Sequence, residues 1–181
     1  MIIGTESILR RIPSVINYRQ RLFFEGIRFS IEMADLAHSR LRGTLPQITF
    51  MRDPSPDNPV IVSAMLDAWA IVDSLHRLRG LIEAMPGLKG KKKSPKIRSL
   101  MEATANVGAL RNTVQHLGTE IHAAFDDKSW TVFGTLSWGV VEPEKNQITA
   151  STLMPGAPRE GASHSIINPM NRQVGIYPSI P

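Results

Sequence analysis

The chain has 181 residues, of which 42% are hydrophobic and 20% are charged. These proportions are typical of a soluble globular protein and argue against an intrinsically disordered chain. Lysine and arginine outnumber aspartate and glutamate by 21 to 16, so the surface is moderately basic and compatible with a polyanionic ligand. The absence of cysteine excludes disulfides, thiolate nucleophiles and cysteine-containing zinc sites.

The first helix is expected to begin after Ser14, a suitable N-cap residue, and to end at Gly43. Apolar side chains three or four residues apart between these points indicate a helix with one buried face. A proline-rich segment over residues 44–59 then predicts a loop, in which Asp57 or Asn58 would cap the next helix.

The second helix should run to about Met85, where Pro86-Gly87 stops it. Its apolar surface is wide, which indicates the most buried helix of the set. It nevertheless contains Asp67 and Asp73, and an ionised carboxylate on such a helix needs a partner. We expect these carboxylates to pair with Arg77 or with a basic residue of another helix.

A third helix is predicted from Pro95 to Phe125, with an interruption near residues 105–108. The polar tract before it, LKGKKKSPKIR, places six basic residues close together in an expected loop: Lys89, Lys91, Lys92, Lys93, Lys96 and Arg98. Such tracts are usually solvated surface, but in an RNA-binding protein this one would follow the phosphate backbone.

After residue 127 the pattern changes from helical spacing to a period of two, from Trp130 to Val140, which is typical of a strand. The turn sequence EPEKN should fold this strand back onto Gln147–Leu153, and a third short strand is plausible around Gln173–Tyr177. Trp130 and Trp138 could stack on bases, although packing against helices is the default interpretation.

The expected fold is therefore mainly α: an antiparallel helical bundle over residues 1–127, with a small antiparallel β hairpin or three-stranded appendage packed on it over 128–181. Residues 1–15 lack an apolar core of signal-peptide length, and the most apolar run contains Asp67. We expect a soluble, cytoplasmic protein.

The segment LRNTVQHLGTEI, residues 110–121, carries the most informative group of polar residues. On a helical wheel its apolar residues form a narrow stripe, and His116 lies roughly 140° from the centre of that stripe. Asn112, His116 and Glu120 are four residues apart, so they follow one another along the polar face, while Arg111 lies at its border. These four residues are expected to form a cluster.

Such a cluster suits phosphodiester cleavage without a metal. An imidazole can accept and donate a proton near neutral pH, and a guanidinium can bind two phosphate oxygens as negative charge develops. Asn112 could position either the imidazole or the phosphate, and Glu120 could orient the imidazole. The remaining histidines, including His76, lack metal-ligand spacing, so we predict no metal and no cofactor.

The motif RNTVQH, Arg111 to His116, late in an all-helical region resembles the signature of HEPN domains. The resemblance implies a helical bundle that dimerises, with two Arg-x4-His motifs meeting across a cleft, and metal-independent endoribonuclease activity that leaves a cyclic phosphate. It assigns phosphate binding to Arg111, proton transfer to His116 and a supporting polar position to Asn112. The role of Glu120 follows from spacing alone.

The resemblance covers six residues and their helical context. In the subgroup silenced by nucleotide transfer from an antitoxin, a tyrosine stands two residues after the histidine, where this chain has Gly118. The leading hypothesis is a homodimeric endoribonuclease that acts on RNA in a toxin-antitoxin or defence system, with a neutralising protein partner. The alternatives are a non-catalytic helical module that binds RNA, nucleotide or a protein partner, and a helical interaction protein in which Arg111 and His116 form only surface hydrogen bonds.

Overall fold

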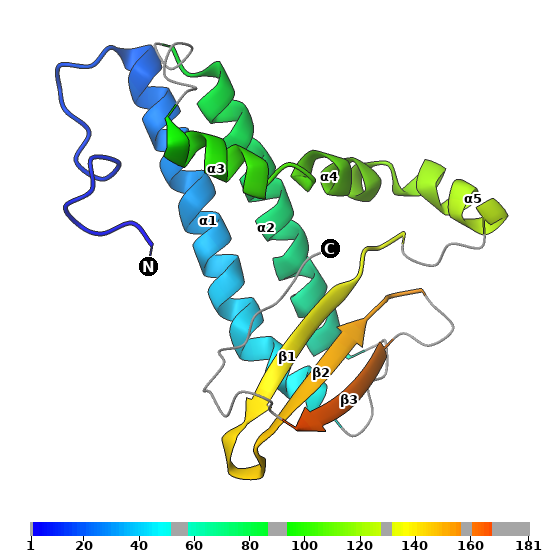
Figure 1. The fold of residues 1–181 in the computed structure, drawn as a ribbon. Coiled ribbons are helices and arrows are strands. Elements are labelled where there is room, and N and C mark those ends of the chain that lie inside the picture. Colours follow the sequence, from blue (N-terminus) through cyan, green and yellow to red (C-terminus); the bar gives the residue numbers. More distant parts are fainter. Residues whose placement is uncertain (1, 52–57, 87–93, 128–131, 157–160, 168–181) are drawn as a thin grey trace. The chain divides into compact units, whose positions relative to one another are not determined.

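The computed structural model describes residues 2–51, 58–86, 94–127, 132–156 and 161–167. Within these ranges the helices and strands follow the order α1 (Tyr18–Thr49), α2 (Pro59–Ala84), α3 (Pro95–Ala103), α4 (Val107–Gln115), α5 (Leu117–Asp127), β1 (Leu136–Glu142), β2 (Gln147–Leu153) and β3 (Gly161–Ile167) (Figure 1). The predicted fold class is confirmed, because the protein is mainly α-helical with a small antiparallel sheet near its C-terminus.

The residues group in space into two compact units. The first unit comprises Met1–His38 and Trp69–Arg111, and the second comprises Ser39–Ala68 and Asn112–Pro181. The boundary between them passes through α1, α2 and α4. The predicted division at residue 127 stays a prediction.

In the first unit, α1 and α2 approach closely at a glycine. A Cβ atom added to Gly26 would lie 3.0 Å from a methyl carbon of Leu81, so a side chain there would force Leu81 to move. The N-terminal segment packs along α1, where the amide of Ile2 donates to the Asp35 carboxylate over 3.0 Å and Arg10 forms an ion pair with Glu32. Helix α1 is thus contacted both by α2 and by the N-terminal segment.

Arg79 of α2 fixes the C-terminal end of α3 in the same unit. Its Nη1 donates to the Met101 carbonyl over 2.6 Å and to the Thr104 hydroxyl over 2.7 Å. The Thr104 hydroxyl in turn donates to the Leu100 carbonyl over 2.6 Å. These bonds satisfy carbonyl groups that a helix end leaves unpaired, and they place a positive charge where the helix dipole is negative.

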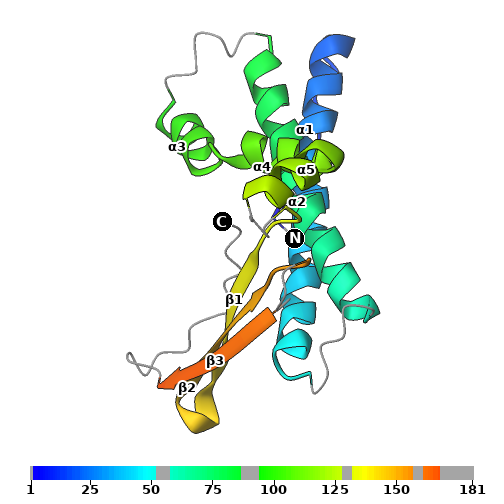
Figure 2. The ribbon, with the colours of Figure 1, turned by 90° about the vertical axis from the view of Figure 1, so that its right-hand side faces the viewer.

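In the second unit, the three-stranded sheet, in the order β1-β2-β3, packs against the end of α1 (Figure 2). Alternate residues of β1 and β2 face the core, as the period of two predicts. Trp138 is 4% exposed, and its Nε1 donates to the Thr49 hydroxyl over 2.7 Å. The Thr49 hydroxyl also lies 3.2 Å from the hydroxyl of Ser151, opposite Trp138 in the register. Trp138 is therefore a packing residue.

The predicted hairpin is confirmed, with the turn over residues 143–145 and Asn146 in the left-handed region at φ 48°. The Lys145 ammonium and the Thr149 hydroxyl both bond to the Glu142 carboxylate, over 2.5 and 2.9 Å, and they lower the pKa of Glu142. The same bond to Glu142 raises the pKa of Lys145. The third strand of the sheet is Gly161–Ile167, whereas the strand expected around residues 173–177 lies outside the described residues.

The predicted bounds of the first helix are wrong at both ends. Helix α1 begins at Tyr18, where the Asn17 side chain accepts a hydrogen bond from the Gln20 amide over 2.9 Å. It continues past Gly43 to Thr49 with Pro46 inside it. Leu45 and Ile48 flank this proline and are buried, so packing of the last turns compensates for the backbone hydrogen bond that proline cannot make.

Helix α2 agrees with its predicted bounds, and the Asn58 side chain accepts a hydrogen bond from the Val60 amide over 3.0 Å. Asp57, the other predicted cap, lies outside the described residues. Among the described helices, it alone is long and apolar enough to cross a membrane by length and composition. Its buried side chains lie in the core of both units, and both of its aspartates are ion-paired.

Candidate functional site

The segment that carries the motif is broken into three short helices. The interruption predicted near residues 105–108 is confirmed, because α3 ends at Ala103 and α4 begins at Val107. A second break falls at His116, between α4 and α5. The His116 amide donates to the Asn112 carbonyl over 2.9 Å, and its own carbonyl accepts from Thr119 and Glu120 over 2.9 and 3.0 Å.

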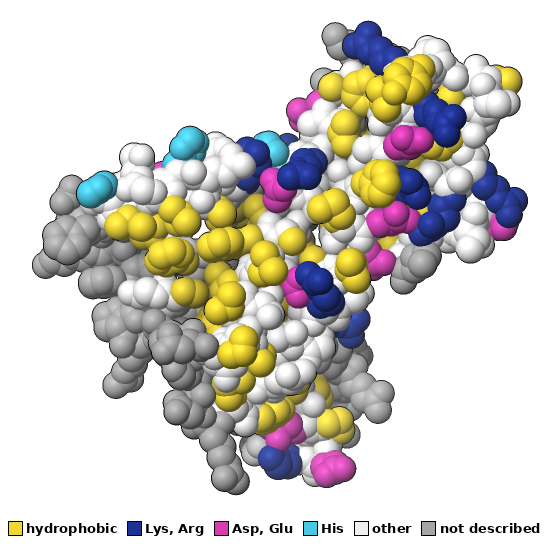
Figure 3. All heavy atoms as spheres, turned by 180° about the vertical axis from the view of Figure 1, so that it is seen from behind, with side chains coloured by type: hydrophobic (Ala, Val, Ile, Leu, Met, Phe, Trp, Pro, Cys, Tyr) yellow, Lys and Arg dark blue, Asp and Glu magenta, His cyan; other side chains and the backbone are white. Residues whose placement is uncertain are grey.

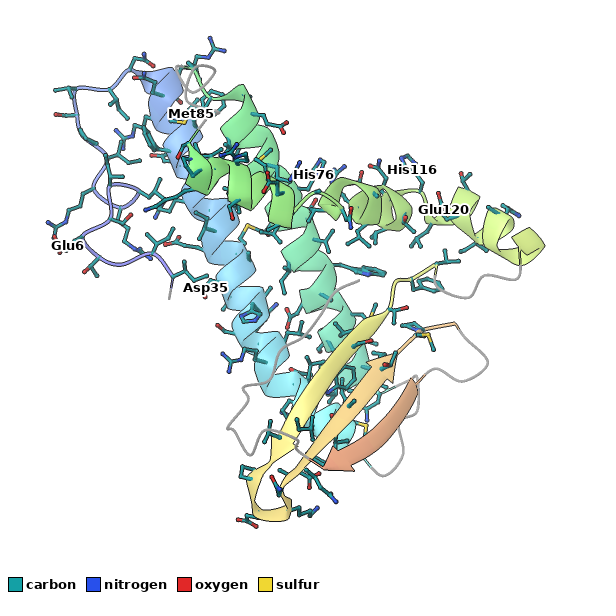
Figure 4. The ribbon with its side chains drawn as sticks, in the orientation of Figure 1. Glu6, Asp35, His76, Met85, His116 and Glu120 are labelled. Carbon is teal, nitrogen blue, oxygen red and sulfur yellow. The ribbon has the colours of Figure 1, made fainter. Side chains whose placement is uncertain are left out.

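This second break changes the geometry expected for the cluster. The prediction that Asn112, His116 and Glu120 follow one another along one polar face assumed a single continuous helix. In the structure Asn112 belongs to α4 and Glu120 to α5. The prediction of one continuous helix is wrong, but the His116 amide still bonds to the Asn112 carbonyl and the Glu120 amide to the His116 carbonyl, and the order of the three side chains along one face stays a prediction. His116 and Glu120 instead belong to the α4–α5 junction, as Figure 4 shows.

Arg111 is held by a carboxylate from another helix of the first unit. Its Nε donates to Oδ1 of Asp73 over 3.2 Å, and the side chains of Arg111 and Asp73 are 28% and 32% exposed. The other oxygen of Asp73 lies 2.6 Å from Nη2 of Arg77. The expectation that Asp73 pairs with Arg77 or a basic residue of another helix is confirmed on both counts.

The other predicted catalytic residues lie in the second unit and remain accessible to a ligand. Asn112 and His116 are exposed, and Glu120 is half-buried. Within the described part of the chain, the imidazole of His116 takes part in no hydrogen bond or ion pair. Neither Glu120 nor Asn112 therefore orients this imidazole here, and the predicted orienting role of Glu120 has no contact that supports it.

His76 is half-buried at the contact between α2 and α4 (Figure 4). A Cβ atom added to Gly108 would lie 4.0 Å from its Nδ1. Gly108 precedes Arg111 by one helical turn, and His76 follows Asp73 by one turn, so the imidazole belongs to the same helix contact as the Asp73–Arg111 pair. The sequence offered no signal for this position, because it arises only when α4 packs on α2.

The apolar side chains on one face of the segment that carries the motif become more exposed from Val107 towards Ile121. Val107 is buried, the intermediate positions are half-buried, and Ile121 is 46% exposed. Figure 3 shows histidine side chains and hydrophobic side chains on separate edges of the α4–α5 segment. The separation of polar and apolar faces agrees with the prediction, although the stripe is less enclosed than a bundle core requires.

The basic tract is described only at its end. Lys96 and Arg98 are exposed on α3 rather than in the expected loop. The other four predicted RNA-binding residues, Lys89, Lys91, Lys92 and Lys93, lie outside the described residues.

Within the described ranges, no group of three or more histidine, aspartate or glutamate residues could hold a metal ion. Comparisons of the chain with protein-family models, curated proteins and solved structures find no match.

Proposed function

We propose that the protein is a metal-independent endoribonuclease of HEPN type, acting in the cytoplasm in a toxin-antitoxin or defence system with a neutralising partner. The observation that carries the proposal is the contrast between its two motif residues. Arg111 is fixed by a carboxylate, as suits a group that binds phosphate in one orientation, whereas His116 is exposed and unpaired among the described residues, as suits proton transfer.

In this reaction the ribose 2′-oxygen attacks phosphorus and the bond to the 5′-oxygen breaks, which leaves a 2′,3′-cyclic phosphate. One imidazole accepts the proton of the attacking hydroxyl, and a second imidazole donates a proton to the leaving oxygen. Arg111 stabilises the charge on the non-bridging oxygens. A homodimer would supply one His116 from each copy and thereby both the base and the acid.

The experiment that tests this proposal measures cleavage of mixed RNA by the purified protein in EDTA. We expect cyclic phosphate ends from the wild type and a loss of about 100-fold to 10,000-fold in rate for His116→Ala, the usual contribution of a general acid or base. Arg111→Ala should be similarly impaired. The matched control is His122→Ala, which removes another exposed imidazole of the same segment and should retain the wild-type rate.

Equal activity of the His116 and His122 variants would overturn the proposal. No cleavage by the wild type, combined with binding of an uncleavable RNA, would favour the alternative of a non-catalytic RNA-binding module.

The proposed homodimer has a candidate interface on α1. Five exposed apolar residues of α1 in the first unit share one narrow face: Tyr18, Leu22, Phe29, Met33 and Leu36. They follow one another at intervals of four, seven, four and three residues, which is the spacing of helices that pair through an apolar seam. We call these five residues the α1 stripe.

A second copy of the chain is the occupant that fits the α1 stripe, because an apolar face of this spacing is complementary to the same face of another helix related by a two-fold axis. The charged residues along one edge are already paired within one copy, Arg21 with Glu25, and Glu32 with both Arg28 and Arg10. The self-pairing therefore rests on the apolar residues of the stripe.

Phe29→Glu should convert the dimer to a monomer, because it places a charge within the apolar seam. Phe29 is 53% exposed, so the folded monomer tolerates the change. Sedimentation equilibrium measures the result. Val62→Glu changes a similarly exposed apolar residue, 60% exposed on α2, and should leave the dimer intact. Dissociation by Val62→Glu but not by Phe29→Glu would assign the interface to another face.

A further inference from the structure

A single carboxylate of the first unit joins two arginines that come from different helices. Asp73 and Arg77 lie one turn apart on α2, and Arg111 belongs to α4. Asp73 uses a different oxygen for each guanidinium, Oδ2 for Arg77 and Oδ1 for Arg111. The carboxylate therefore holds the two guanidinium groups next to each other, although their positive charges repel.

The atoms that Asp73 uses leave much of each guanidinium available. Arg111 is bound through Nε, and within the described part of the chain it makes no other hydrogen bond or ion pair. Arg77 is bound through Nη2 and is 58% exposed. A guanidinium has five N–H donors, and phosphate oxygens are the acceptors that match a pair of them. The terminal nitrogens of Arg111 can thus receive an anion while Nε stays anchored.

The charge balance of the cluster also favours an anion. Two guanidinium groups against one carboxylate leave a net positive charge, and the half-buried imidazole of His76 lies at the same helix contact. Asp73 and Arg111 are each about one-third exposed, so the cluster is open to a ligand from solvent yet partly shielded from salt.

We propose that Arg77 and Arg111 form a phosphate-binding pair for the RNA backbone and that Asp73 is the positioning residue that aligns them. The choice of RNA as the ligand rests on the proposed function; the pair itself rests on the contacts of the first unit. Arg111 binds one phosphate, and Arg77 binds the same or the neighbouring phosphate. Asp73 does not touch the RNA and acts through the two arginines.

Binding and cleavage are measured separately, so that failure of the pair is distinguishable from failure of the nuclease. The probe for binding is a fluorescein-labelled 2′-O-methyl oligoribonucleotide of mixed sequence, which cannot form a cyclic phosphate. Its affinity is followed by fluorescence anisotropy as a function of salt concentration. Arg77→Gln should weaken binding and reduce the slope of log K against log salt by about 0.7, the contribution of one phosphate contact to a single strand.

The matched control is Arg11→Gln, which removes the same charge from an exposed ion pair of the N-terminal segment. It should leave the salt slope at the wild-type value. An unchanged affinity and slope in Arg77→Gln would overturn the assignment of Arg77.

Asp73→Asn separates positioning from plain electrostatics. Because Asp73→Asn removes a negative charge beside the phosphate site, RNA affinity should stay equal or rise. Because the two arginines are no longer aligned, kcat should fall on the order of tenfold or more, with KM unchanged or reduced. Asp73→Glu, which keeps the charge, should recover part of kcat. Wild-type kcat in a folded Asp73→Asn variant would overturn the positioning role.

A wild type that binds the probe but cleaves no RNA would refute the nuclease. The phosphate-binding pair would still be supported if Arg77→Gln and Arg111→Gln each reduced the salt slope.

Discussion

Replacing Arg40 by methionine should destabilise the protein by about 2 to 4 kcal/mol, although the arginine itself is more than half exposed. The reason is its partner. Asp67 has a side chain that is 4% exposed, and Arg40 bonds to its Oδ1 through Nη2 and, over 3.0 Å, through Nε. Without the guanidinium, a carboxylate remains in the core with no compensating charge. Urea denaturation at pH 7 measures the free energy of unfolding.

Removing the aspartate should have a smaller effect, because the arginine left behind can be hydrated at the surface. Asp67→Leu is expected to cost about 1 kcal/mol or less, and the double variant Arg40→Met with Asp67→Leu should be more stable than Arg40→Met alone. If Asp67→Leu and the double variant are both more stable than Arg40→Met, the loss of stability in Arg40→Met comes from the uncompensated buried carboxylate. Loss of the Arg40–Asp67 attraction alone would affect all three variants. A cost below about 1 kcal/mol for Arg40→Met would mean that water reaches Asp67.

Trp138→Ala should cost about 3 to 5 kcal/mol, the usual range for removing a buried aromatic side chain. The indole fills the contact between β1 and the end of α1 and donates to the Thr49 hydroxyl. Trp138→Phe keeps most of the apolar surface and loses only that donor, so it should cost about 1 kcal/mol. Thermal or urea unfolding of both variants measures these differences.

The phenylalanine variant also tests the idea that this tryptophan stacks on RNA bases. Because the ring is 4% exposed in the folded protein, Trp138→Phe should bind an uncleavable RNA with wild-type affinity. A marked loss of affinity in a folded Trp138→Phe variant would contradict the packing role assigned here.

The hairpin was the most predictable part of the sheet. The other strand predictions did not agree as well: β1 begins at Leu136 although the pattern of two began at Trp130, which lies outside the described residues, and β3 over Gly161–Ile167 was not predicted. The period of two in β1 and the turn residues up to Asn146 set the register of the hairpin, and β2 has the predicted bounds. The α3 start at Pro95 and the α2 end near Met85 also followed from local signals. These features depend on residues close in sequence, and they could therefore be read from it.

The errors come from contacts between residues that are distant in sequence. Gly43 and Pro46 resemble a helix end, but burial of Leu45 and Ile48 extends α1 beyond both. The local signal for the break at His116 is Gly118, two residues after it, and a single glycine inside a helical pattern is also compatible with one continuous helix.

For the candidate site, the sequence could name Arg111 and His116 but not their surroundings. It indicated that Asp73 needs a cation, and Arg77 was an obvious candidate at a spacing of four residues. The second partner, Arg111, lies 38 residues away, and only the packing of α4 on α2 brings it to Asp73. The position of His76 beside Gly108 depends on the same packing.

The division of the motif segment into α3, α4 and α5 has a thermodynamic consequence. These helices have 9, 9 and 11 residues, and helices shorter than about 12 residues have little stability of their own in water. The segment therefore depends on tertiary contacts such as those of Arg79 and Asp73 to stay helical. Its amides should exchange with solvent by local unfolding, well before the chain unfolds globally. A ligand that bridges Arg111 to Arg77 would slow that exchange, because its binding energy would add to the cost of opening the segment.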